Sequence, residues 1–439
     1  MVKIRIKRGL DVPVKEKAEG RAEEKIDTAT IAYDFSPFSD KTRLRAKVNI
    51  DDHVKIGDVL AFDPHLQERV FLSPAAGKVI EIARGEKRRL LSIIIEKDEQ
   101  EEANEIPPLD LKESKENIVK EIFKRGLSPF IFKRPFNKLI EIDEIPRAIF
   151  INATSSAPLS PEPESLLLKK VDAFQKGLNF LAKIAPCHLV SQSGPFDRFE
   201  NVEHHTAKGP HPIESPTIHI EQVAPIEGVE DCIWTVGVDG VTSIGSVLGN
   251  GQWSLNRVVA VTGPGFKQEG RKLYEVRWGS EIEPIVKPWE TENTDRIISG
   301  DVLTGRGGQR HLGFFDHQIC ALAKQKKRRL IPFMRLFSPN FSFFRIYAHP
   351  KNLIFSSKKC GENRAIVDGS LYQKVMPINI PVEALIKAIM AKDFDMALGY
   401  GLYKVVPEDF SVCEFICPSK MPLTQIVEEG IKEYLELYR

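Results

Sequence analysis

The sequence has no long hydrophobic run, no excess of charge of one sign and few cysteines. Its 439 residues include 62 lysines and arginines against 61 aspartates and glutamates, a formal net charge of +1. Nucleic-acid-binding proteins usually present a basic face, so this balance argues against a nucleic-acid partner. No apolar run approaches the roughly 18 residues of a membrane-spanning helix, and the amino terminus lacks the apolar core of a signal peptide. We therefore expect a cytosolic chain, or one on the cytosolic side of something larger, with no transmembrane segment of its own.

The six cysteines are too irregularly spaced for a disulfide framework or a metal cluster. Cys413 and Cys417 alone lie close together in the chain, as Cys-x-x-x-Cys followed by proline. Iron–sulfur clusters and structural zinc sites need four ligands, commonly grouped in the sequence. The segment has the outline of a cluster-binding loop without the ligands to hold a cluster. We predict that both side chains are buried packing residues in a reducing compartment.

The strand-to-helix junctions lack the Gly-x-Gly-x-x-Gly pattern, in which backbone N–H groups bind the phosphates of a dinucleotide. Glycine-rich segments occur later, at 237–251 and 305–308, among residues typical of short strands. We interpret both segments as hairpin turns.

Two clusters of side chains have the right chemistry for ligands but also ordinary explanations. Four histidines occur within residues 204–219, at His204, His205, His211 and His219. They lack the paired or helical spacing of metal ligands, and we predict no metal site. The basic run Lys324–Arg329 would suit anionic lipid, although a solvated segment or a patch that meets a membrane subunit explains it equally well.

The first half of the chain divides by pattern into an extension and two folded regions. Residues 1–45 form an N-terminal extension, which begins with a short strand and is otherwise polar and irregular up to about Arg43. Residues 46–102 have short strands and turns and resemble the barrel-sandwich hybrid domain of lipoyl and biotinyl carriers, without a lysine at the carrier position. Residues 103–235 alternate strand, helix and strand, which predicts a Rossmann-like α/β domain that lacks a nucleotide loop.

The second half predicts two more regions. Residues 236–365 contain paired strands that resemble a β-grasp domain, and residues 366–439 form a helical C-terminal domain with the relic cluster-binding loop. The fold class is therefore multidomain α/β.

Individual elements are predicted from hydrophobic period and from end signals. The expected helices are one after Ser114, one that Ser160 caps and that ends near Ile184, one after Pro381 that turns Met390 inward, and one over 424–438 that buries Tyr438. The expected strands are 148–152, 188–190, 257–263, 272–279 and 340–355.

Five segments together resemble the NqrA family, whose members are subunits of Na⁺-translocating NADH:quinone reductases. They are Lys133–Phe136, Ile298–Gly305, Lys374–Ile380, Glu408–Cys413 and Cys417–Lys420. The tail segments are the most specific, and the resemblance extends over nearly the whole chain. It implies a complex that couples NADH oxidation and ubiquinone reduction to Na⁺ export and that uses NADH, flavins, iron–sulfur centres and ubiquinone. It implies that this chain itself binds no cofactor and carries no catalytic residue.

The same resemblance implies that the partners are the other subunits of the complex. It also implies a peripheral position on the cytoplasmic side of the bacterial inner membrane. The alternative is a cofactor-free adaptor or binding module of another membrane redox complex. The family tends to show His-Pro-Ala-Gly, whereas His211-Pro212 continues here as Ile-Glu, so we assign no role to that loop.

An aromatic segment stands where related subunits of other respiratory complexes keep a glycine-rich flavin and NADH loop. Its phenylalanines would fill the space that a flavin needs, and two cations lie beside them. An apolar former cofactor cleft of this kind suits a quinone head group, although the rings can equally serve to plug the cleft. The candidate quinone-site residues are Phe130, Phe132, Lys133, Arg134 and Phe136.

Overall fold

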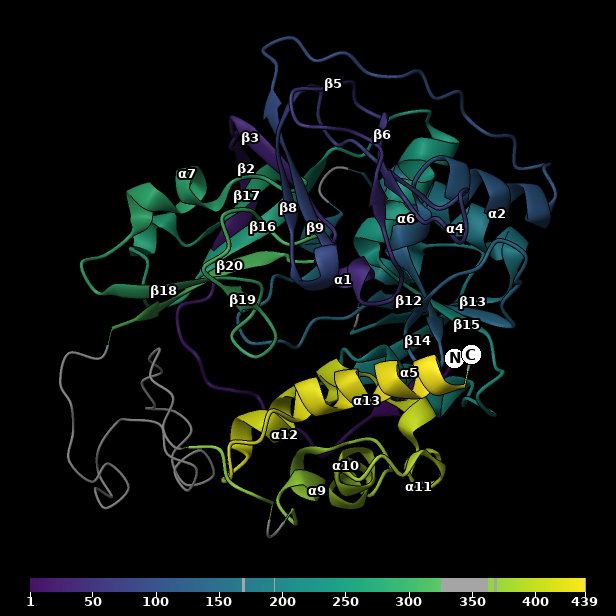
Figure 1. Ribbon diagram of the computed structural model, residues 1–439, viewed down its shortest axis with the longest axis vertical. Coiled ribbons are helices and arrows are strands. Elements are labelled where there is room, and N and C mark those ends of the chain that lie inside the picture. The colour runs from purple at the N-terminus through teal and green to yellow at the C-terminus, as the bar shows by residue number, and fades with distance from the viewer. Residues whose placement is uncertain (168–169, 193, 325–361, 367–368, 439) are drawn as a thin grey trace.

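The computed structural model describes residues 1–167, 170–192, 194–324, 362–366 and 369–438 (Figure 1). Within these ranges the chain forms four sheets and a helical tail. The strand predicted at 340–355 lies outside the described residues, as does the basic run after Lys324. Among the helices in the described ranges, none is long and apolar enough to cross a membrane.

The largest sheet has seven strands in the order β1-β14-β13-β12-β15-β10-β11. The strands are β1 (Lys3–Arg5), β10 (Ile131–Arg134), β11 (Lys138–Leu139), β12 (Ala148–Ala153), β13 (Cys187–Ser191), β14 (Glu203–Lys208) and β15 (Ile233–Gly237). From β1 to β15 the neighbours are parallel, whereas β10 and β11 are antiparallel to theirs. The two strands predicted at 148–152 and 188–190 are thus confirmed as β12 and β13.

Different elements cover the two faces of this sheet, because side chains alternate along each strand. The helices on one face are α2 (Lys115–Lys124), α4 (Val171–Ile184) and α6 (Val238–Ile244). In β12, Ile149 and Ile151 share a core with these helices. Phe150 belongs instead to the core of the opposite face, which contains α5 (Pro216–Val223) and the tail. The sheet is therefore the middle layer of three.

The second sheet has six strands in the order β19-β18-β20-β16-β17-β2. They are β2 (Glu19–Lys25), β16 (Asn256–Thr262), β17 (Lys272–Arg277), β18 (Thr294–Ser299), β19 (Arg306–Gly307) and β20 (Gln318–Ala323), with α7 (Ile282–Val286) packed on one face. The antiparallel pair β16–β17 confirms the two strands predicted there. β18 and β19 are also antiparallel, which confirms the hairpin at the glycines of 305–308.

Two small antiparallel sheets pack against each other around one core. The strands are β3 (Thr30–Asp34), β9 (Leu90–Lys97), β8 (Gly77–Arg84) and β5 (His53–Val54) in one sheet, and β4 (Arg45–Ala46), β6 (Val59–Phe62) and β7 (Val70–Leu72) in the other. Tyr33, Leu60, Phe71 and Ile93 meet in their common core. The short-stranded pattern predicted for this part of the chain is confirmed.

The prediction that residues after the first strand are irregular up to Arg43 was wrong. This region supplies β2 to the six-stranded sheet and β3 to a small sheet, and it contains α1 (Ser36–Ser39). The partners are distant in the sequence: β1 pairs with β14, and β2 pairs with β17. A short polar edge strand has little pattern of its own, so its structure depends on those remote neighbours.

The tail is helical, as predicted, and Figure 1 shows its helices gathered below the seven-stranded sheet. The helices are α9 (Tyr372–Val375), α10 (Val382–Met390), α11 (Phe394–Gly399), α12 (Ser411–Ile416) and α13 (Leu423–Leu437). Two side chains predicted to point inward do not, because Met390 is 55% exposed and Tyr438 is 62% exposed. Both residues lie at the end of their helix, where the hydrophobic face extends past the core.

The single helix predicted from Ser160 to Ile184 is interrupted. A short helix, α3 (Pro163–Leu166), begins after Glu162, and α4 begins after Lys170, whose backbone is not helical. Val171, which was predicted to face inward, is 37% exposed. α3 packs against β16 and α4 packs against α6, so tertiary contacts override the continuous helical pattern. The cap predicted at Ser114 is confirmed, because its side chain accepts a hydrogen bond from the Asn117 N–H.

The hairpin interpretation of the glycines at 237–251 was wrong. This segment forms α6 and a single π-helical turn at Gly245–Gly249. The glycines permit close helix packing, since a Cβ on Gly245 would lie 1.7 Å from the carbonyl oxygen of Ala173. A Cβ on Gly177 of α4 would likewise lie 2.0 Å from the carbonyl oxygen of Val241.

Candidate functional site

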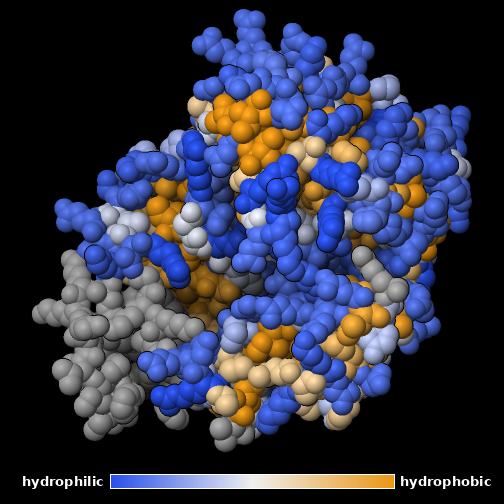
Figure 2. All heavy atoms as spheres, viewed as in Figure 1, coloured by the Kyte–Doolittle hydropathy of each residue, from blue (hydrophilic) through white to orange (hydrophobic). Residues whose placement is uncertain are grey.

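A cleft of about 1540 Å³ lies between the small sheets, the edge of the seven-stranded sheet and the tail. Of the five predicted site residues, Phe130, Phe132, Arg134 and Phe136 line it, and Lys133 does not. Lys41, which follows α1, lines the cleft too. Figure 2 shows a mostly hydrophilic surface with hydrophobic residues on the floor of a hollow between the upper part of the molecule and the tail helices.

The alternation of side chains along β10 explains this division of the predicted residues. Phe132 and Arg134 are two positions apart and point toward the cleft, whereas Lys133 points away from it. The Lys133 ammonium forms an ion pair with the carboxylate of Glu144. The structure therefore brings three aromatic rings and Arg134 together at the cleft and separates Lys133 from them.

Two of the three phenylalanines are packing residues. Phe130 is packed between the rings of Trp278 and Phe314, at centroid distances of 5.4 and 5.1 Å. The ring of Phe136 lies 5.2 Å from that of Tyr434 and joins β10 to the tail. Both rings therefore have structural roles that need no ligand.

Phe132 has a more open environment. It is half-buried, and its ring lies 5.4 Å from that of Phe315, which is 36% exposed. The ammonium nitrogen of Lys41 lies 5.6 Å from the centroid of the Phe132 ring, within the range of a cation–π interaction. This aromatic and cationic group faces the open cleft. Sequence reasoning missed Phe315 and Lys41, because neither lies near the 130–136 segment in the chain and neither belongs to a recognisable motif.

Arg134 is 2% exposed and belongs to a buried polar network. Its Nη1 donates a hydrogen bond of 3.0 Å to the Thr217 hydroxyl, which in turn donates one of 2.8 Å to the carboxylate of Asp409. That carboxylate also accepts hydrogen bonds from the Ser215 hydroxyl and the Val406 N–H. Burial raises the pKa of Asp409, and the attraction of Arg134 opposes this shift. The guanidinium thus joins β10 to α5 and the tail, an arrangement that explains its burial without a ligand.

The relic cluster-binding loop contains thiols that pack against an aromatic side chain. Cys413 and Cys417 are free cysteines, 1% and 0% exposed. The Cys417 sulfur lies 3.0 Å from the hydroxyl oxygen of Tyr372 and accepts a hydrogen bond from the Met421 N–H. Burial raises the pKa of Cys413, so this thiol stays protonated. The prediction of buried packing residues is confirmed for both cysteines.

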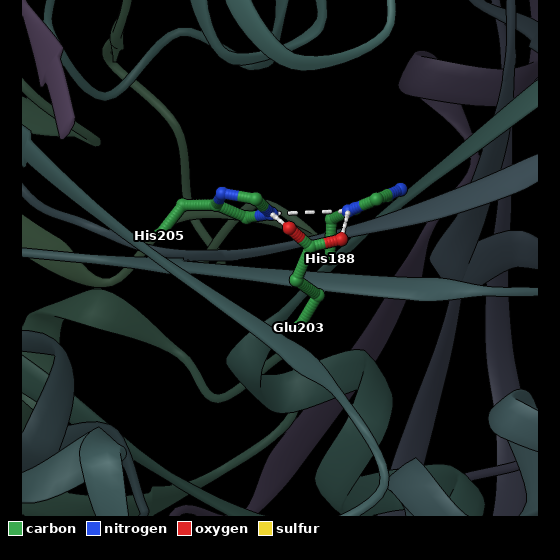
Figure 3. Close-up of side chains that lie close together, drawn as sticks. All are labelled: His188, Glu203 and His205. Atoms are coloured by element: carbon green, nitrogen blue, oxygen red, sulfur yellow. Dashed lines mark hydrogen bonds and ion pairs between the residues drawn. The ribbon is translucent and has the colours of Figure 1, made fainter. Parts of the chain in front are cut away.

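Of the four histidines in the predicted loop, His205 lies in the one group of three metal-ligating side chains found within the described ranges. Figure 3 shows its partners, His188 of β13 and Glu203 of β14. The potential ligand atoms all lie within 4.8 Å of one another, and His188 Nδ1 lies 3.0 Å from His205 Nε2. The other three histidines have separate local partners: Phe199 for His204, Ser156 for His211 and Ile213 for His219.

Hydrogen bonds determine which nitrogen of His205 carries the proton. The backbone N–H of Val2 donates to His205 Nδ1 over 3.0 Å, so the proton of a neutral ring lies on Nε2. His205 Nε2 then donates to His188 Nδ1, and the two rings form a hydrogen-bonded pair. Burial and the neighbouring His188 lower the pKa of His205 to about 4, which keeps the pair neutral. A metal at Nε2 would require this proton to move and the hydrogen bond from Val2 to break.

Three family models match successive parts of the chain. The NqrA N-terminal barrel-sandwich hybrid domain matches residues 4–98, the NqrA second alpha/beta domain residues 113–253, and the NQRA C-terminal domain residues 258–309. The NqrA protein of Chlamydia pneumoniae, which is named for its place in a Na(+)-translocating NADH-quinone reductase, is 33% identical over 462 aligned residues. The alignment covers 99% of this chain and 97% of that protein. The chain belongs to the NqrA family.

Other proteins with the same name support this membership. Those of Saccharophagus degradans and Pseudomonas aeruginosa are 29% and 28% identical, and each alignment covers 98% of both chains. A chain of an NAD+-reducing [NiFe]-hydrogenase covers 65% of this NqrA-family chain and 57% of its own length at 13% identity. Its TM-score of 0.34 is too low to bear on the fold. The family resemblance found in the sequence is confirmed, as are the barrel-sandwich and α/β parts of the predicted fold class.

Proposed function

We propose that this chain is the NqrA subunit of a Na⁺-translocating NADH:quinone reductase, which couples NADH oxidation and ubiquinone reduction to Na⁺ export. Membership of the NqrA family over nearly the whole chain supports the proposal. In this proposal the chain is peripheral, lies on the cytoplasmic side of the bacterial inner membrane and binds the other subunits.

The test of this assembly is co-purification. We expect an affinity-tagged full-length chain, isolated from gently solubilised membranes of its own host, to bring down the remaining subunits of an NADH:quinone reductase in constant ratio. Mass spectrometry of the eluate identifies them. Constant recovery of a different redox complex would instead support the adaptor alternative.

The finer division of the fold is also a proposal. It consists of an extension at 1–45, a barrel-sandwich domain at 46–102, a Rossmann-like domain at 103–235, a β-grasp domain at 236–365 and a helical domain at 366–439. The parallel order of β14-β13-β12-β15 supports the Rossmann-like part, because strand order reverses between β12 and β15. The packing of α6 against α4 favours a boundary after α6.

We propose further that this subunit holds no flavin, iron–sulfur cluster or metal of its own. In the tail, Cys413 and Cys417 supply two thiols, where a cluster needs four ligands. Phe130 occupies the region of the missing glycine-rich loop through its contacts with Trp278 and Phe314. The proton position on His205 disfavours a metal at the histidine pair.

The cleft is the proposed site at which a quinone head group approaches this subunit. One observation carries the proposal: Phe132 presents a half-buried ring to a large cleft, beside the exposed ring of Phe315. A flat apolar head group fits against such rings, and convergent polar groups would orient it. Phe130, Arg134 and Phe136 line the same cleft but also have full structural roles. Lys133 is less suited, since its ammonium is paired with Glu144.

Phe132→Ala is expected to weaken quinone binding about ten-fold, because burial of one phenyl ring contributes about 1.5–3 kcal/mol. The measurement is a titration of the full chain with a short-chain ubiquinone, together with a melting curve. Phe62→Ala is the matched control, because Phe62 is half-buried in β6 and does not line the cleft. Unchanged affinity with a lower melting temperature would show that the ring of Phe132 only plugs the cleft.

A further inference from the structure

Lys41 occupies a fixed position at the mouth of the aromatic group in the cleft. Its backbone N–H donates a hydrogen bond of 2.9 Å to the carbonyl oxygen of Phe38, at the end of α1. Phe38 is fully buried in the core of the small sheets, which anchors this turn. The Lys41 side chain extends from the turn until its ammonium lies over the Phe132 ring.

The Lys41 ammonium has neither an ion pair nor a hydrogen bond within the part of the chain that the structure describes. Other cations that line the cleft are already engaged: Arg89 with Asp40, Arg134 with Thr217, and Arg306 with Asp34. A cation without a polar partner in a partly enclosed apolar site is unfavourable, because it has lost part of its hydration. A ligand that offers an acceptor atom to Lys41 would relieve this cost.

The charges that face Lys41 come from three elements. Burial lowers the pKa of Lys41; Glu408 in the 3₁₀ turn Pro407–Phe410 and Glu428 on α13 oppose this shift, and Arg134 on β10 adds to it. The effect of burial is larger than that of either glutamate. The ammonium therefore loses its proton at a lower pH than an exposed lysine does.

We propose that Lys41 donates a hydrogen bond to a carbonyl oxygen of the quinone whose ring lies against Phe132. This inference rests on the proposed quinone site and adds the residue that orients the head group there. The chemistry is complementary, because a lysine ammonium can only donate and a quinone carbonyl can only accept. The site would therefore select ligands that combine a flat apolar ring with a carbonyl acceptor on its edge.

The experiment is a titration of the full-length chain with a short-chain ubiquinone at pH 7 to 10. It compares the wild type with Lys41→Met, Lys41→Arg and Phe132→Ala. Lys387→Met is the control, because that lysine is 53% exposed on α10, outside the cleft. Lys41→Met is expected to weaken binding about ten-fold at pH 7, since a hydrogen bond from a charged donor is worth about that much. Lys41→Arg should retain most of the affinity.

The pH profile separates an orienting role from a structural one. Affinity of the wild type should fall as the pH rises and Lys41 loses its proton, and both Lys41→Met and Lys41→Arg should show no such fall. If the wild type and Lys41→Met bind with equal affinity and equal pH profile while Phe132→Ala binds weakly, the role of Lys41 is refuted and the quinone site stands. If the wild type binds no quinone, both the site and the role of Lys41 are refuted.

Discussion

Asp409→Ala is expected to lower the free energy of unfolding by about 3–5 kcal/mol, the usual cost of removing one partner from a buried charged network. Asp409 is 2% exposed and accepts hydrogen bonds from the hydroxyls of Ser215 and Thr217 and from the Val406 N–H. Removal of the carboxylate leaves these three donors without their acceptor. It also leaves the buried guanidinium of Arg134 without the compensating charge.

The variant is compared with the wild type by urea unfolding at pH 7. Glu408→Ala is the matched control, since this neighbouring glutamate is exposed, and its loss should change the free energy of unfolding by less than about 1 kcal/mol. Combining Asp409→Ala with Arg134→Met should cost less than the sum of the single changes, because each exposes the other partner. Additive costs, or a cost for Asp409→Ala as small as that of the control, would show that the network does not stabilise the tail.

The features that sequence reasoning predicted correctly depend on local signals. The Ser114 cap, the buried strand at 148–152 and the tail helices are each specified within a dozen residues. The cysteine prediction also succeeded, because four ligands cannot come from Cys413 and Cys417. In these cases the residues that determine the structure are close together in the chain.

The errors arise where distant residues decide the outcome. Gly245 looked like a turn residue, but its missing side chain admits the carbonyl of Ala173 in α4. The first 45 residues looked irregular, because the partners of β1 and β2 lie some 200 residues downstream or more. At the candidate site the 130–136 segment was found from its aromatic composition. Lys41 and Phe315 come to the same cleft from remote parts of the chain, and Asp409, although within a recognised tail segment, gave no sign of its link to Arg134.

Acidification from pH 6.5 to about 4 is expected to destabilise the protein strongly through its buried histidines. His219 on α5 is fully buried, and its Nε2 donates a hydrogen bond of 2.8 Å to the carbonyl oxygen of Ile213. Its Nδ1 has no hydrogen-bond partner, so a second proton would be buried there without an acceptor. Burial is the main cause that lowers the pKa of His219 to about 4.

The direction of the effect follows from proton linkage. Between pH 6.5 and about 4 the unfolded chain binds a proton at His219 that the folded chain does not, so stability falls as the pH falls through this window and levels off below it. Each pKa unit corresponds to about 1.4 kcal/mol, so His219 alone accounts for about 3 kcal/mol. His205, also with a pKa of about 4, acts in the same direction.

The measurement is the free energy of unfolding at pH 7.5 and 4.5 for the wild type and His219→Gln. Glutamine can still donate to the Ile213 carbonyl but does not titrate, so the loss between the two pH values should shrink by about 2–3 kcal/mol. His65→Gln is the matched control, because His65 is exposed in the loop between β6 and β7 and should leave the difference unchanged. Equal losses in the wild type and His219→Gln would mean that His219 is not buried as a neutral ring, and the packing of α5 on the seven-stranded sheet would need to differ from the arrangement described above.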